Sequence, residues 1–64
     1  MTINGVKKEF PAGIALTELL LQEGYEKERI AVELNEEIVP RAAYDTTFLS
    51  EADKIEVVSF VGGG

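Results

Sequence analysis

Apolar and polar residues alternate most regularly over residues 54–61, KIEVVSFV. Successive side chains of a β-strand point to opposite faces, so this alternation predicts a strand. Ile55 and Val57 then share one face, whereas Val58 and Phe60 share the other. A sheet that is covered on one side usually keeps its other side polar, so the second pair is the more unusual one.

A helical period appears earlier, over residues 14–24, IALTELLLQEG. Three leucines at i, i+3 and i+4 form one apolar stripe, which predicts an amphipathic helix of about two to three turns. These leucines are Leu16, Leu19 and Leu20. Gly24 is placed to end the helix, because glycine readily adopts the left-handed conformation found there. The N-terminal cap is Ala15 or Thr17, and alanine offers no side-chain acceptor in that position.

Two further segments are expected to be extended. Asn4-Gly5 favours a tight turn because both residues tolerate positive φ, which predicts a hairpin with Ile3 and Val6 as a cross-strand pair. Residues 30–34, IAVEL, predict a strand that buries alternate side chains on one face. The expected buried set is Ile30, Val32 and Leu34.

The segment between these strands and the last one is less regular. IVPR contains Pro40, which lacks an N–H donor and therefore suits a sheet edge or a strand end. Residues 42–53, AAYDTTFLSEAD, predict a loop in which Phe48 and Leu49 complete a small core.

The order of hairpin, helix, strand, short strand, loop and long strand predicts an α+β fold. We expect a mixed sheet of four to five strands with one main helix packed on one face. Residues 1–61 are expected to form one domain, and residues 62–64 a flexible glycine tail.

Composition excludes several classes of function. The 64 residues include no cysteine and no histidine, so thiol chemistry and the commonest general base and metal ligand are absent. The net charge of −6 argues against nucleic acid and anionic membranes as partners and favours a basic protein surface. Residues 1–10 do not have the pattern of a signal peptide, so the cytoplasm is the expected compartment.

The glycine tail and the exposed face of the last strand are the candidate functional features. Val58 and Phe60 suggest a protein-binding patch. Gly62, Gly63 and Gly64 reach about 10 Å beyond the strand and fit a channel too narrow for a Cβ atom. The tail delivers one group, the Gly64 carboxylate, which must be activated before it can react, for example as an acyl-adenylate. A cloning remnant or a frayed terminus is the alternative.

Together these residues resemble the sulfur carrier proteins of thiamine thiazole synthesis, the ThiS family, which have the ubiquitin-like β-grasp fold. The resemblance covers essentially the whole chain. It rests on Asn4-Gly5 and on LTELL, AVELNEEIVPR and DKIEVVSFVGGG at residues 16–20, 31–41 and 53–64. The stretch NEEIVPR joined to a terminal Gly-Gly is typical of this branch, whereas Gly-Gly alone indicates the wider ubiquitin-like group. The chain differs from the family at Ala15, where a hydroxyl residue usually caps the helix.

The resemblance implies a protein co-substrate that is not itself an enzyme and has no cofactor or metal of its own. A ThiF-type adenylyltransferase would adenylate Gly64 with ATP and magnesium, and a persulfide sulfur donor would convert the product to a thiocarboxylate. A ThiG-type thiazole synthase would accept the sulfur. The residues implied in partner binding are Gly62, Gly63, Val58 and Phe60.

Other functions are compatible with the same sequence. The small subunit of molybdopterin synthase would use the same fold and the same thiocarboxylate with a different acceptor. A ubiquitin-like modifier would form isopeptides with lysines. A β-grasp interaction domain would carry an inert tail.

Overall fold

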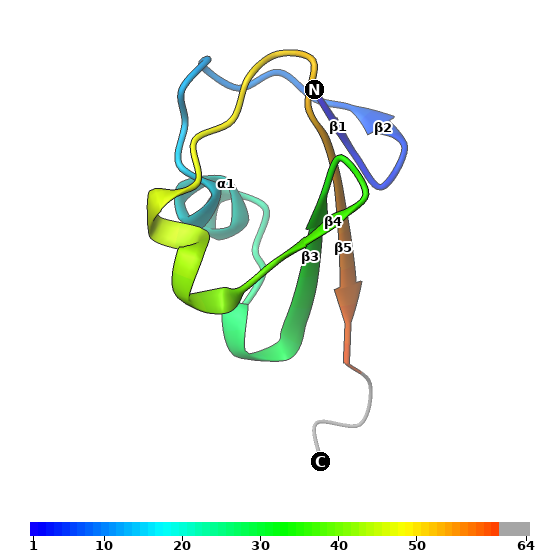
Figure 1. Ribbon diagram of the computed structural model, residues 1–64. Coiled ribbons are helices and arrows are strands. Elements are labelled where there is room, and N and C mark those ends of the chain that lie inside the picture. Colours follow the sequence, from blue (N-terminus) through cyan, green and yellow to red (C-terminus); the bar gives the residue numbers. More distant parts are fainter. Residues whose placement is uncertain (61–64) are drawn as a thin grey trace.

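The computed structural model of the 64-residue chain describes residues 1–60 (Figure 1). Within them, five strands form one sheet: β1 (Thr2–Ile3), β2 (Val6–Lys7), β3 (Ile30–Leu34), β4 (Glu37–Val39) and β5 (Lys54–Ser59). The helices are α1 (Leu16–Gln22) and two 3₁₀ helices, η1 (Lys27–Arg29) and η2 (Arg41–Thr46).

The sheet has the strand order β2-β1-β5-β3-β4. β1 runs parallel to β5, and the other neighbouring pairs are antiparallel. The last strand therefore lies at the centre of the sheet, between the first strand and β3 (Figure 1). The predicted α+β fold, a mixed sheet of four to five strands with one main helix, is confirmed.

The first hairpin forms as its sequence predicts. Asn4 and Gly5 have φ values of 51° and 82°, and Ile3 pairs with Val6 across the turn. A second two-residue turn joins β3 to β4 through Asn35 and Glu36, both also at positive φ. Two tight turns thus fix the register of both outer strand pairs.

The leucine stripe of α1 packs against the sheet, and Leu16, Leu19 and Leu20 are all buried. Gly24 follows the helix at φ 83°, as expected for a terminating glycine. Ala15 is the N-cap residue and makes no side-chain cap. The Thr17 hydroxyl instead donates a hydrogen bond to Asp45 in η2.

The core lies between α1 and the face of the sheet that carries Ile55 and Val57. Ile30 and Val32 are buried as predicted, whereas Leu34 is only partly buried at the end of β3. Prediction and structure therefore agree on the buried face of the two central strands.

The expectation of a loop over residues 42–53 is wrong at its start, where η2 forms and buries Tyr44. Leu49 is buried as predicted, but Phe48 is 64% exposed. The backbone of Phe48 bridges to Ala15 in an extended conformation. Because extended neighbours point in opposite directions, Phe48 faces outward where Leu49 faces inward. Tyr44, and not Phe48, is the aromatic side chain that this segment buries.

Candidate functional site

Of the two predicted partner-binding residues inside the described part of the chain, Val58 lies in β5 and Phe60 directly follows it. The strand ends at Ser59, one residue before Phe60, whereas the sequence pattern had placed Phe60 inside it. Val58 is 58% exposed and Phe60 is 54% exposed, whereas Ile55 and Val57 on the opposite face are buried. The predicted separation of the two faces is confirmed. We call the side of the sheet turned away from α1 the open face. Gly62, Gly63 and Gly64 lie outside the described residues.

The backbone around Val58 and Phe60 is held on both sides. The Phe60 N–H donates a hydrogen bond of 2.8 Å to the Arg29 carbonyl, in η1. On the other side, the Val57 N–H donates to the Asn4 side-chain oxygen, also at 2.8 Å. The two exposed side chains are therefore presented by a fixed backbone as the chain leaves the sheet.

Arg41, the first residue of η2, bonds to the same turn. Its Nε donates a 2.8 Å hydrogen bond to the Lys27 carbonyl, and its Nη2 lies 3.5 Å from the Ile30 carbonyl. These two carbonyls flank Arg29, whose own carbonyl accepts from Phe60. Arg41 thus stabilises the turn against which the end of β5 is bound.

The open face has a third large apolar side chain, Ile38, that the sequence reasoning did not select. It is 76% exposed and pairs with Glu33 of β3. Its neighbour Val39 pairs with the buried Val32, so alternation places Ile38 on the opposite, open face. The alternation that identified Val58 did not identify Ile38, because β4 has only three residues, too few to show a clear period of two. Ile38 and Val58 add exposed apolar side chains to this face, and the exposed Phe60 follows β5 directly.

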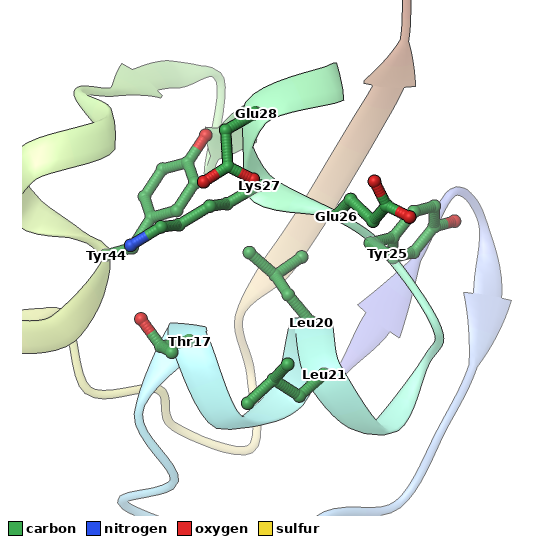
Figure 2. A pocket seen from close by; sticks show the side chains of 8 residues that line it. All are labelled: Thr17, Leu20, Leu21, Tyr25, Glu26, Lys27, Glu28 and Tyr44. Carbon is green, nitrogen blue, oxygen red and sulfur yellow. The ribbon is translucent and has the colours of Figure 1, made fainter.

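The helical side of the molecule has a groove of about 410 Å³ (Figure 2). Its apolar lining includes Leu20, Leu21, Tyr25 and Tyr44, and its charged lining comes from η1 and the residue before it. Leu21 comes from α1, and Tyr25 from the segment that follows the helix (Figure 2). Neither Val58 nor Phe60, the predicted site residues within residues 1–60, lines this groove, which distinguishes it from the open face.

Asp53 has a perturbed pKa just before β5. Partial burial raises its pKa, but hydrogen bonds from the Ser50 backbone N–H and the Asn35 side chain outweigh burial and hold the pKa below its ordinary value. Asn35 also accepts a 2.9 Å hydrogen bond from the Lys54 N–H. This network fixes the start of β5 to the β3–β4 turn, so its role is structural.

Residues 1–60 contain no group of three or more His, Cys, Asp or Glu side chains arranged to hold a metal ion. In the same part of the chain, no helix has the length and apolar character needed to cross a membrane.

Comparison with known proteins gives consistent matches. The model of the ThiS family matches residues 1–64. Among curated relatives, the thiazole synthase of Paramagnetospirillum magneticum is 39% identical over 64 residues, and that of Magnetococcus marinus is 44% identical over 62 residues. These alignments cover 100% and 97% of this chain but only 20% and 19% of the relatives. The chain thus spans about one fifth of the length of the thiazole synthases it matches.

A solved structure matches over nearly its full length. The crystal structure of the thiamine biosynthesis protein ThiS from Geobacter metallireducens superposes with a TM-score of 0.82 at 35% sequence identity. The match covers 98% of this chain and 96% of that one. The β-grasp fold expected from the sequence is therefore confirmed.

Proposed function

This chain belongs to the ThiS family, and from that premise we propose that it is a sulfur carrier that supplies the sulfur atom of the thiazole ring of thiamine. The carried sulfur is bound at the carboxyl group of Gly64. The chain acts as a co-substrate, because the reactions on that carboxyl group belong to partner enzymes. The partners are a ThiF-type adenylyltransferase, a persulfide donor and a ThiG-type thiazole synthase.

The proposed chemistry begins with a poor electrophile. A C-terminal carboxylate is ionised at neutral pH, so a nucleophile cannot displace its oxygen directly. In the adenylyltransferase, which binds ATP and magnesium, the carboxylate oxygen attacks the α-phosphorus and pyrophosphate leaves. The terminal sulfur of the persulfide then attacks the carbonyl carbon of the acyl-adenylate, and AMP leaves. A thiol cleaves the resulting acyl disulfide at the donor sulfur, which releases the thiocarboxylate and a disulfide.

The observation that carries this proposal is the position of the open face relative to the end of the chain. Val58 and Phe60 are exposed within the last residues that the structure describes, and Gly62 follows Phe60 by two positions. A partner that contacts these side chains is close to the glycines, which offer no side-chain obstacle to a narrow active site. The family match extends through Gly64 and includes this segment.

The test is the intact mass of the protein after incubation with the ThiF-type adenylyltransferase, ATP and a sulfur donor. We expect a product heavier by the difference between one sulfur and one oxygen atom. A variant that lacks Gly63 and Gly64 is the control and gives no such product. If the full chain stays unmodified with an enzyme that modifies another ThiS protein, or if the truncated variant still supports growth without thiamine, the proposal is wrong.

A further inference from the structure

Two glutamates lie directly opposite one another at the centre of the open face. Glu33 of β3 is the register partner of Glu56 of β5. Each has buried neighbours along its own strand, Val32 beside Glu33 and Val57 beside Glu56, so both carboxylates point away from the core. Both side chains are half-buried by their surroundings.

Neither carboxylate has a cationic partner in residues 1–60. The ion pairs in that part of the chain are Lys8–Glu23, Arg29–Glu26 and Lys54–Glu36. Like charges directly opposite in an antiparallel pair are destabilising, so the fold gains nothing from this arrangement. Positions at which a sequence breaks a local rule of this kind are often functional.

Apolar side chains lie beside the two carboxylates, and Lys54, two residues before Glu56 on the same face, is paired with Glu36. Ile38 pairs with Glu33 from the other side, in β4. Val58 lies two residues beyond Glu56 on the same face, and its register partner is Ala31. A flat partner surface that covers these side chains would exclude water from the carboxylates. An uncompensated pair of negative charges would then be strongly unfavourable, whereas a cation between them would be strongly bound.

We propose that Glu33 and Glu56 together bind one arginine side chain of the adenylating partner, with Ile38 and Val58 packed against apolar side chains around it. The inference rests on the proposed function, because it assigns the partner of the same open face. A guanidinium group fits two carboxylates better than an ammonium group does, since its planar fork directs several N–H donors at once. The net charge of −6 complements a basic partner surface. Adenylation is the first step, so this partner meets the carrier before any covalent bond joins them and depends on noncovalent docking.

The test is the Kd between this protein and the ThiF-type adenylyltransferase without ATP, measured by calorimetry at low and at moderate salt. The Glu33→Gln/Glu56→Gln double variant keeps the shape of both side chains and removes both charges. The matched control is Glu28→Gln/Glu51→Gln, which removes the same charge from exposed positions away from this face. We expect about tenfold or greater weakening in the first variant, with a smaller salt dependence, and little change in the control.

The stability of the free protein separates a docking role from a structural one. Removing opposed like charges should leave the urea midpoint unchanged or raise it, while binding weakens. Equal Kd values for the two double variants would overturn the inference and leave the proposed function standing. A lowered urea midpoint in Glu33→Gln/Glu56→Gln would also overturn it. So would a urea midpoint that rises with added magnesium chloride in the wild type but not in this variant. If the wild-type protein does not bind the adenylyltransferase, the proposed function and the inference are both wrong.

Discussion

The side chain of Asn4 accepts a hydrogen bond of 2.8 Å from the Val57 backbone N–H, although 53 residues separate them in sequence. β1 ends at Ile3, so its parallel ladder with β5 would otherwise stop there. The Asn4 N–H already donates to the Ile55 carbonyl at 2.9 Å. Asn4 therefore extends the ladder by one further bond and also supplies a positive φ for the first turn.

Substitutions at Asn4 can separate these two roles. Asn4→Gly keeps the favourable φ but leaves the Val57 N–H without its acceptor, so we expect a loss of about 1–2 kcal/mol in the free energy of unfolding. Asn4→Ala should lose about 1 kcal/mol more, because alanine is strained at positive φ. Asn4→Asp retains both features and is the control. Urea denaturation measures all three, and a glycine variant as stable as the wild type would contradict the role of the hydrogen bond.

The Asn4–Val57 bond also shows which features sequence reasoning could reach. The turn at Asn4-Gly5, the leucine stripe of α1 and the two faces of β5 are encoded locally, so periodicity and turn residues identified them. Two other features depend on which strands become neighbours and on their register: the hydrogen bond between Asn4 and Val57, and the position of Glu33 opposite Glu56. No local pattern carries that information.

Tyr44 and Phe48 show a second limit. Both are aromatic residues in the segment that was expected to be a loop, and composition alone could not decide which of them is buried. The 3₁₀ turn of η2 places Tyr44 in the core, and the bridge between Phe48 and Ala15 turns Phe48 outward. Ile38 was missed because a strand of three residues is too short for alternation to be recognised.

The uncapped start of α1 offers a stabilising change. Ala15 has the extended backbone of an N-cap residue but no side-chain acceptor, and Glu18 lies three positions later. Ala15→Ser would complete a capping box with Glu18 and should raise the free energy of unfolding by about 1 kcal/mol. Thermal and urea unfolding measure the effect. The same substitution in a Glu18→Ala background should give a smaller gain, and equal gains in the two backgrounds would show that no capping box forms.

Asp53 should make stability depend on pH in the acid range. Its folded pKa is lower than its ordinary value of 3.8, so its contribution is complete above that value. The contribution decreases as the pH falls below 3.8 and is lost once the pH passes below the folded pKa. We therefore expect Asp53→Asn to be less stable than the wild type at neutral pH, with a difference that shrinks towards pH 2.

Urea unfolding across this pH range tests that expectation. Glu51→Gln is the control, because Glu51 lies in the turn just before Asp53 and its side chain makes no hydrogen bond or ion pair within residues 1–60. Glu51→Gln should therefore be about as stable as the wild type at neutral pH, whereas Asp53→Asn should not. A constant difference between Asp53→Asn and the wild type at every pH would exclude the ionised carboxylate as the source of the stabilisation.

Val58 and Phe60 are expected to act in docking and not in folding. Val58→Ser and Phe60→Ser should each lower kcat/KM for adenylation by about tenfold, since a few side chains at the centre of an interface carry most of the binding energy. The control is Phe48→Ser, which removes a phenylalanine that is 64% exposed but lies away from the end of β5. Equal loss of adenylation in Phe48→Ser and Phe60→Ser would show that the open face has no special role.

The tail glycines should differ in their tolerance of a side chain. On the proposed function, Gly63 and Gly64 form the carrier terminus, and Gly62 would add reach between Phe60 and that pair. We expect Gly63→Ala to lower the rate of adenylation by about tenfold or more, because a small misplacement of the carboxylate in an active site is costly. Gly62→Ala should be milder. ATP–pyrophosphate exchange with the ThiF-type adenylyltransferase measures both rates, and urea unfolding shows whether either change alters the fold. Equal losses of exchange at unchanged stability would mean that Gly62 meets the same narrow channel as Gly63.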